Sequence, residues 1–464
     1  MAPAKYSFMA CSSEAGRRGR SSGQRSLRVL AVGVVFALVV AGCGRDDEDD
    51  ADAPPDASGE TSDGTAGTSD GTTSDGTTGD DTSGSAAEGS ISVWAMGTEG
   101  ENLDVLAEDF MAEFPDVSVE VTAVPWDAAH DRIVNSIAGG EVPDVSLIGS
   151  TWMGEFAKLG GLEPTPENID PSQFFEGSWD TTVVDGVSYG VPWYVETRLI
   201  YYRTDLAEDG GFNQAPANWD ELTQLVQAQA DAGAEFGISL LPGGIGSWQT
   251  YMPFFWQAGG EILDDAGDFA LGSDACVEAL TFYDSFFEEG LAPSAVSDVP
   301  VEAGFTNGDV GAFISGPWMI GVVTDAGADP ATWTVARQPT EAAGTSFVGG
   351  GNLAVFEQSD NKAAAWAFVE YLSRPEVQVK WYETVKDLPS VQAAWDDPAL
   401  ADDELVAAFG DQLEDAKSAP AIPNWEQIAS AIDDQIEVVT AGETTPEDGC
   451  AAMQQEAESI GTGL

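Results

Sequence analysis

The feature that most limits the possible folds is a regular alternation of strand-like and helix-like segments that begins near residue 90. Strand-like runs rich in apolar and β-branched residues occupy residues 90–96, 117–124 and 143–149. Amphipathic helical patterns follow them at residues 101–114, 126–140 and 151–161. This order predicts a mostly parallel sheet with helices on its faces.

The carboxyl ends of these three predicted strands carry aromatic side chains. In open sheets of this kind, ligands bind at the carboxyl ends of the strands. The segments found there read "WAMGTEG", "VPWD" and "IGSTW", and each contains a tryptophan. The sequence therefore predicts a ligand site at this edge of the sheet.

The folded body is expected to run from about Ser90 to Leu464. That length exceeds the roughly 250–300 residues at which a single hydrophobic core stops growing, so two lobes are expected. Further amphipathic helices are predicted at residues 219–233, 274–290, 362–373 and, as a pair, within 425–460. The predicted fold class is α/β with two lobes.

The N-terminus is typical of a targeting segment. A basic region that ends at Arg28 precedes an apolar run from Val29 to Gly42, which is short for a membrane span and has the length of a signal sequence. The run ends in "VAGC", which matches the bacterial lipoprotein cleavage box and predicts a signal peptide over residues 1–42 with lipid on Cys43. A plain secretory signal followed by a chance cysteine is the alternative. Residues 43–89 consist largely of Ser, Thr, Gly and Asp, which predicts a disordered acidic tether.

Charge and residue usage exclude several classes of function. The net charge of −63 argues against DNA, RNA or an anionic membrane as the ligand and indicates a strongly hydrated surface. His130 is the single histidine, so multi-histidine metal sites are excluded, and a histidine-based triad would have to use His130 itself. There is no phosphate-binding glycine motif after a strand. We therefore expect no cofactor and no metal.

Two cysteines fall within the predicted body, Cys276 and Cys450. Outside the cytoplasm an even pair favours a disulfide, and two free thiols are the alternative.

The stretch "VPWYVETRLIYYRTDL", residues 191–206, resembles a buried strand but contains Glu196 and Arg198. In an extended chain these two side chains point to the same face. Burying both charges without partners would cost several kcal/mol, so they must pair with each other or contact a polar ligand.

Many of the 14 tryptophans lie beside Gly or Pro at predicted strand ends. Indole faces suit the apolar C–H faces of sugars, and charged groups suit the hydroxyl rims.

An ordered series of segments resembles the extracellular sugar-binding proteins of bacterial ABC transporters, the family of the maltose- and trehalose/maltose-binding proteins. The segments are "IAGGEVPDV", "GSTWMGEFAKLGGLEP", "DGVSYGVPWYVETRLIYYRTDL", "PANWDEL", "FTNGDVGAFISGPW", "GGGNLAVFEQSDNKAAAWAFVEYLSRPEVQ", "DLPSVQAAWDDP" and "GETTPEDG". The resemblance extends from about Ser90 to the C-terminus. It implies two α/β lobes of the type II periplasmic-binding-protein fold, joined at a hinge, with sugar held between them.

The resemblance also implies lobe boundaries and site residues. Lobe one is expected to comprise residues 90–195 and 347–372, and lobe two residues 197–346 and 373–464. Glu196 corresponds to a sugar-contacting glutamate of the family, and Trp318 in "SGPW" corresponds to a sugar-stacking tryptophan. The full set of expected ligand-binding residues is Trp126, Thr151, Trp152, Glu196, Arg198, Trp248, Trp256, Trp318, Gly351, Asn352 and Trp425.

The predicted function is capture of a mono- or oligosaccharide and its delivery to the permease of an ABC importer, without covalent chemistry. The protein is expected to be a monomer, anchored by lipid to the outer face of the cytoplasmic membrane. Three alternatives remain open: the same fold with another solute such as glycerol phosphate, a glycoside hydrolase with paired carboxylates, and a polysaccharide-binding adhesin. Phosphate would favour clustered basic residues or helix N-termini, and the body has few basic residues.

Overall fold

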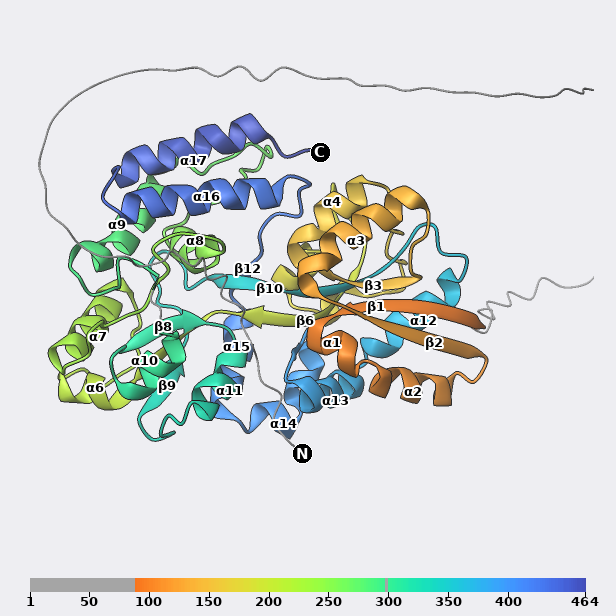
Figure 1. Ribbon diagram of the computed structural model, residues 1–464, viewed down its shortest axis with the longest axis horizontal. Helices are drawn as coiled ribbons and strands as arrows, with labels where there is room; N and C mark the ends of the chain where they lie inside the picture. The colour runs from red at the N-terminus through yellow and green to blue at the C-terminus, as the bar shows by residue number, and fades with distance from the viewer. Residues whose placement is uncertain (1–87, 297–298) are drawn as a thin grey trace, which may run out of the picture. The chain divides into compact units, whose positions relative to one another are not determined.

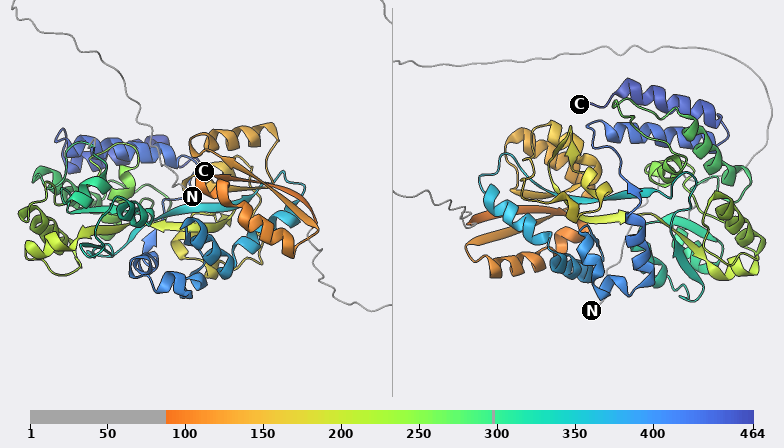
Figure 2. Two further views of the ribbon diagram at one scale, coloured as in Figure 1. Left: turned by 60° about the horizontal axis from the view of Figure 1, so that its bottom comes forward. Right: turned by 180° about the vertical axis from the view of Figure 1, so that it is seen from behind.

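Two separate β-sheets, each with helices packed on it, organise the chain (Figure 1). This computed structural model describes residues 88–464 except 297 and 298. The predicted signal peptide, Cys43 and almost all of the predicted tether therefore lie outside the described residues. The arrangement agrees with the predicted α/β class, and Figure 2 shows the two sheets from other sides.

The sheet of lobe one has seven strands, in the order β11-β6-β10-β3-β1-β2, with β12 paired to β10. The strands are β1 Gly89–Met96, β2 Val117–Val124, β3 Val145–Gly149, β6 Val191–Thr197, β10 Ser346–Val355, β11 Leu388–Pro389 and β12 Ala416–Lys417. β1 is parallel to β2 and β3, whereas β10 is antiparallel to both β3 and β6. The prediction of a mostly parallel sheet was wrong for this half, because β10 enters the sheet as the chain returns from lobe two.

The helices of lobe one cover both faces of this sheet (Figure 1). They are α1 Gly97–Asn102, α2 Asp104–Glu113, α3 Trp126–Gly139, α4 Met153–Lys158, α5 Glu176–Asp180, α12 Lys362–Leu372 and α13 Pro375–Val385. A short hairpin, β4 Val183–Val184 and β5 Val187–Ser188, and two 3-10 turns, η1 Ser150–Trp152 and η2 Pro171–Gln173, connect them.

Helix α13 packs in lobe one, although the sequence analysis placed residues 373–464 in lobe two. Its Trp381 stacks on Trp193 of β6 with ring centroids 4.9 Å apart, and Val377 joins the same hydrophobic core. After α13 the chain adds β11 to the edge of β6. No helix was predicted over residues 375–385, and a local helical pattern does not indicate which sheet a helix will cover. The remaining lobe boundaries stay predictions.

Lobe two contains the antiparallel three-stranded sheet β8-β7-β9. Its strands are β7 Leu199–Arg203, β8 Ala312–Ser315 and β9 Trp333–Ala336. Its helices are α6 Thr204–Asp209, α7 Trp219–Asp231, α8 Ser247–Gln257, α9 Asp274–Glu288, α10 Val301–Asn307, α11 Trp318–Asp325, α14 Pro398–Ala401, α15 Glu404–Leu413, α16 Trp425–Thr440 and α17 Pro446–Ile460, with the 3-10 turn η3 Gln392–Asp396 before α14. A disulfide joins Cys276 of α9 to Cys450 of α17, as the sequence predicted.

The stretch from Val191 to Leu206 is two strands rather than one. β6 ends at Thr197 in the sheet of lobe one, and β7 begins at Leu199 in the sheet of lobe two. The returning strand β10 lies alongside, since the Thr197 hydroxyl donates to the Phe347 carbonyl at 2.7 Å. The chain therefore crosses between the lobes at Arg198 and again at the start of β10. Over residues 88–464, with the gap at 297 and 298, no helix has the length and apolar content needed to span a bilayer.

Candidate functional site

An ion pair lies at the crossing between the lobes. Arg198 Nη1 and Nη2 donate to the two carboxylate oxygens of Glu196 at 3.0 and 3.3 Å. Arg198 Nη2 also donates to Gln249 Oε1 of α8 at 2.7 Å. The two charges thus share one face of the crossing strand, as predicted, and they connect β6 to a helix of lobe two. The Arg198 side chain is 8% exposed and that of Glu196 is 23% exposed, so the carboxylate is the part of the pair that a ligand could reach.

The position of Gln249 depends on a carboxylate from another helix. Asp433 of α16 accepts hydrogen bonds from the backbone N–H groups of Gly246 and Trp248 at 2.8 and 2.7 Å, and from the Ser247 hydroxyl at 2.7 Å. These bonds satisfy N–H groups at the start of α8 that have no partner within the helix. They fix the first turn of α8, which presents Gln249 to Arg198.

Trp318 forms an exposed aromatic surface beside this ion pair. Its ring centroid lies 4.8 Å from the Arg198 guanidinium carbon, and its residue is 47% exposed. Gly316 makes this position possible, because a Cβ atom there would lie 2.1 Å from the indole. An indole that is open on one side and rests on a guanidinium can stack against the apolar face of a sugar ring.

Lobe one presents a second aromatic group at its strand ends. Trp126, the first residue of α3, is 37% exposed and contacts Trp152 edge to face at 5.6 Å between ring centroids. Thr151 and Trp152 form the turn η1 directly after β3 and are partly buried. The parallel strands β1, β2 and β3 bring these residues to one edge of the sheet, which is where the sequence placed a ligand site.

A groove between the lobes adjoins Trp152. It has a volume of about 550 Å³. Lobe one contributes His130, Trp152, Glu155, Lys158 and Leu159. The first turn of α16 and the two residues before that helix contribute Pro423, Asn424, Glu426 and Gln427. The single histidine is fixed in its wall, since His130 Nε2 lies 2.8 Å from Glu155 Oε2 and its ring contacts Trp152. Aromatic, amide and charged groups from both lobes therefore meet around one opening.

Three carboxyl groups gather around Tyr194 on the same side of β6, and the sequence analysis missed two of them. Burial, followed by the charges of Glu99, Asp387 and Glu196, raises the pKa of Tyr194 well above its usual value. Burial also raises the pKa of Glu99. Burial and the nearby Glu99 raise the pKa of Asp387 well above that of an ordinary carboxyl. The available signal for Glu99 was its place directly after the first strand, within "WAMGTEG".

Five predicted site residues lie instead within the packed interior. Trp248 and Trp425 are 5% and 0% exposed and contact each other edge to face at 5.1 Å. Asn352 donates to the Thr181 hydroxyl at 2.9 Å, and Gly351 packs closely against Tyr194. Trp256 is 3% exposed. These five residues are buried in this structure, and their contact with a ligand stays a prediction.

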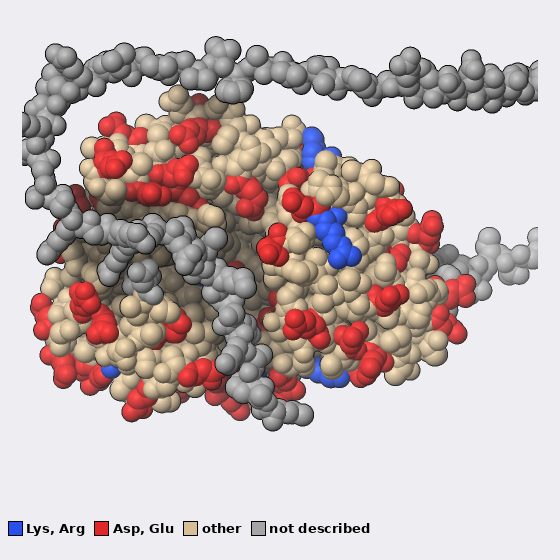
Figure 3. All heavy atoms as spheres, viewed as in Figure 1, with Lys and Arg blue, Asp and Glu red and all other residues tan. Residues whose placement is uncertain are grey.

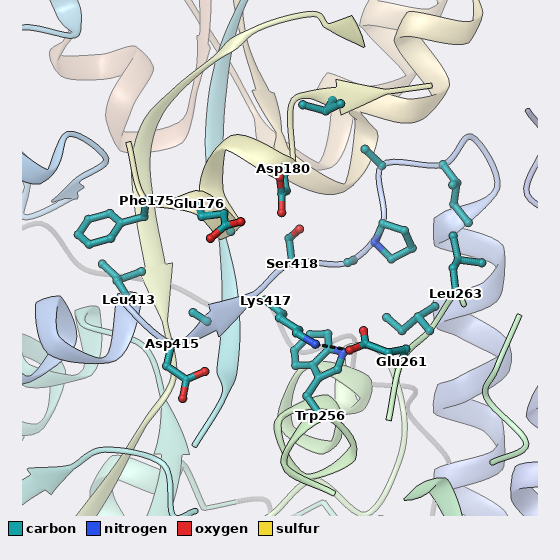
Figure 4. Close-up of a pocket in the computed structure, with 18 of the residues that line it drawn as sticks. Phe175, Glu176, Asp180, Trp256, Glu261, Leu263, Leu413, Asp415, Lys417 and Ser418 are labelled. Carbon is teal, nitrogen blue, oxygen red and sulfur yellow. Dashed lines mark hydrogen bonds and ion pairs between the residues drawn. The ribbon is translucent and has the colours of Figure 1, made fainter. Parts of the chain in front are cut away.

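Trp256 lines a different cavity, shown in Figure 4. This cavity, of about 780 Å³, lies between α5 of lobe one, residues 261–263 of lobe two and the segment 413–422. The carboxyl groups of Glu176 and Asp180 point toward it, and Lys417 forms an ion pair with Glu261 across one side. It contains no other predicted site residue.

The surface around these openings is acidic. Asp and Glu side chains are spread over the visible face of both lobes, and few Lys or Arg side chains appear among them (Figure 3). Among the described residues, excluding 1–87 and 297–298, no group of three or more His, Cys, Asp or Glu side chains could hold a metal ion.

Two α/β lobes joined by crossing strands, with aromatic and polar groups facing each other between them, define a solute-binding protein. Residues 95–379 match the family described as bacterial extracellular solute-binding protein, and the chain belongs to that family. The two-lobed fold is confirmed by similarity to the sugar-binding protein MalE of Xanthomonas citri, at 33% identity and a TM-score of 0.75 over 80% of this chain and 97% of that one.

Two curated relatives are similar over most of their length. The galactooligosaccharide-binding protein of Bacillus subtilis is 25% identical over 356 residues, which cover 74% of this chain and 82% of the relative. The maltotriose-binding protein of Pyrococcus abyssi is 27% identical over 348 residues, which cover 71% and 73%. These relatives are binding proteins, and they support the predicted class rather than the glycerol phosphate or hydrolase alternatives.

Proposed function

We propose that this chain is the extracellular sugar-binding subunit of an ABC importer. It captures a mono- or oligosaccharide between its lobes and delivers it to the membrane permease. The observation that carries this proposal is the exposed Trp318 indole resting on Arg198, with Glu196 and Gln249 beside it. Such a group supplies both of the contacts that a sugar needs, an apolar stacking face and charged hydrogen-bonding partners.

Binding is expected to favour a closed arrangement of the lobes. Trp126 and Trp152 belong to lobe one, whereas Trp318 and Gln249 belong to lobe two. A ligand that contacts both sets stabilises the state in which they approach, since it gains contacts there that the open state lacks. No covalent step is needed for this function.

Calorimetric titration of the full chain with a panel of mono- and oligosaccharides tests the proposal. We expect micromolar binding of at least one sugar, accompanied by a change in tryptophan fluorescence. Trp318→Ala should weaken that binding about 10- to 100-fold, because buried aromatic contacts dominate such interfaces. Val187→Ala, which shortens an exposed side chain on the β4–β5 hairpin, serves as the control. A folded protein that binds no sugar in a broad panel would contradict the proposal.

We further propose that the mature protein is monomeric and is anchored through lipid on Cys43. The support is the lipoprotein cleavage box that ends the apolar run, together with the acidic tether that follows it. One acyl chain binds a membrane only marginally, whereas several chains anchor stably.

Cys43→Ser is expected to release the protein from the membrane fraction of expressing bacteria. The serine hydroxyl cannot take the thioether-linked lipid, so the exported protein should appear in the soluble or secreted fraction. Radiolabelled fatty acid should mark the natural chain and not the variant. Equal membrane association of both proteins would support the plain secretory alternative or another anchor.

A further inference from the structure

A buried carboxyl group lies next to the exposed indole of Trp126. Glu99 of α1 is 8% exposed, and Trp126 at the start of α3 is 37% exposed. A Cβ atom placed on Gly97 would lie 2.9 Å from the Trp126 indole and 3.4 Å from Glu99 Oε2. The two side chains therefore both lie next to Gly97, close to each other. The carboxylate and the aromatic ring therefore belong to one wall of the site.

The polar partners of this carboxyl group are neutral. Glu99 interacts with the Tyr194 side chain. The same holds for Asp387, the second buried carboxyl group near Tyr194, which accepts a hydrogen bond from the neutral Trp381 Nε1 at 3.0 Å. Within residues 88–464, apart from 297 and 298, neither Glu99 nor Asp387 takes part in an ion pair. The nearby Arg198 is already bonded to Glu196 and Gln249.

The charges around Tyr194 are therefore unbalanced. Glu99, Glu196 and Asp387 all act on the Tyr194 side chain, and of these three only Glu196 is paired with a guanidinium, that of Arg198. Buried like charges destabilise one another in their ionised forms, and an added cation relieves this repulsion. A neutral sugar would leave the imbalance in place, whereas a ligand that carries a positive charge would remove part of it.

We propose that the sugar held in this site carries a protonated amino group, which the Glu99 carboxylate binds while the Trp126 indole contacts the amine-bearing ring. This inference rests on the proposed function and specifies the chemical class of its ligand. An ammonium–carboxylate hydrogen bond is charge-assisted and stronger than a neutral one. The face of an indole also attracts a nearby cation, so both neighbours favour an amine over a hydroxyl at this position.

Matched pairs of sugars that differ only by amino groups in place of hydroxyl groups, one on each ring, test the inference. Suitable pairs are glucosamine with glucose, galactosamine with galactose, and the deacetylated chitobiose disaccharide with cellobiose. We expect calorimetry of the full chain near neutral pH to show at least about 10-fold tighter binding of the amino member in the pair that fits the site.

Glu99→Gln should reduce the affinity ratio between the two members of that pair to about one, because the amide keeps the shape of the side chain and removes its charge. Glu101→Gln is the matched control, since Glu101 is an exposed carboxyl group on the same helix, and it should leave the ratio unchanged. If Glu99→Gln does not fold, as judged by circular dichroism, Trp126→Leu provides the second test and should lower the same ratio.

The possible failures are distinguishable. Equal or tighter binding of the neutral member in a pair that binds would overturn this inference and leave the proposed function standing. An amino preference that persists in both Glu99→Gln and Trp126→Leu would also overturn it. If no member of any pair binds, and the wider sugar panel is silent as well, the proposed function fails and this inference fails with it.

Discussion

Arg198→Met is expected to weaken sugar binding at least about 100-fold, the largest loss of affinity that we predict for a single substitution. The variant removes the guanidinium beneath Trp318 and the hydrogen bond to Gln249. It also leaves the Glu196 carboxylate without its partner in a partly buried position. Both lobes lose a contact at the point where the chain crosses between them, so the substitution affects the site and the geometry of closure together.

The same substitution should lower the free energy of unfolding only moderately. Removing one partner of a fully buried ion pair costs about 3–5 kcal/mol, but Glu196 retains some solvent contact, so about 1–3 kcal/mol is expected. Urea unfolding followed by circular dichroism measures this quantity, and calorimetric titration measures the affinity of the same preparation. A large loss of binding with a small loss of stability is the expected combination.

Arg203 offers a matched control. It forms a similar pair with Asp205, also two residues along the chain, with distances of 2.8 Å from Nε and 2.6 Å from Nη2, but at the far end of β7. Arg203→Met should lower stability and leave sugar binding unchanged. If Arg198→Met and Arg203→Met have equal effects on both quantities, the Glu196–Arg198 pair is a structural feature of the crossing and not part of the sugar site.

The local pattern of the sequence predicted the elements of the first half of lobe one closely. The strands near residues 90–96, 117–124 and 143–149 appear as β1, β2 and β3, because short apolar runs between turn residues depend mainly on local preference. The antiparallel entry of β10 and the packing of α13 on lobe one were not predicted. Both depend on contacts between segments far apart in the chain, for which a single sequence gives no direct signal.

The division of residues 191–206 illustrates this limit. The residues before and after Arg198 have the same strand-like composition, and one residue separates a strand of one sheet from a strand of the other. Glu196 and Arg198 did indicate that the stretch is not an ordinary buried strand, since a continuous buried strand would not accommodate two unpaired charges. The residue pattern indicated only that the two charges need partners, and the expectation of a lobe boundary at this point came from the family resemblance.

Tryptophan position was only partly predictable for a similar reason. Trp126 and Trp318 are exposed at helix starts, whereas Trp248 and Trp425 pack against each other in the interior of lobe two. All four lie near the start of a helix, so position along the chain does not distinguish them. Exposure is decided by the helices that pack above each ring, and this depends on the tertiary arrangement.

Removal of the disulfide, by the double substitution Cys276→Ala and Cys450→Ala, should produce the largest change in stability. The bond joins α9 to α17 across a sequence separation of 174 residues. The loop that the disulfide closes includes β10, α12 and α13 of lobe one. In the unfolded chain the bond therefore restrains residues that belong to both lobes of the folded protein. The chain-entropy relation for a loop of this length gives about 5 kcal/mol of lost stability. For a body of this size that corresponds to a decrease in Tm of roughly 5–8 °C.

The measurement compares thermal and urea unfolding of the natural chain, the natural chain with a reductant, and the double variant. The reduced protein and the variant should behave alike, since both cysteines are 1% exposed and lie in the same hydrophobic core, where alanine is readily accommodated. Sugar affinity should not change, because α9 and α17 lie within lobe two and contribute no residue to the ion pair or its aromatic neighbours. Unchanged unfolding after reduction, with the thiols of Cys276 and Cys450 titrated in denaturant, would mean that the bond exists but does not restrain the unfolded chain. Free thiols at Cys276 and Cys450 in the untreated denatured protein, located by labelling and peptide mapping, would mean that the bond does not form.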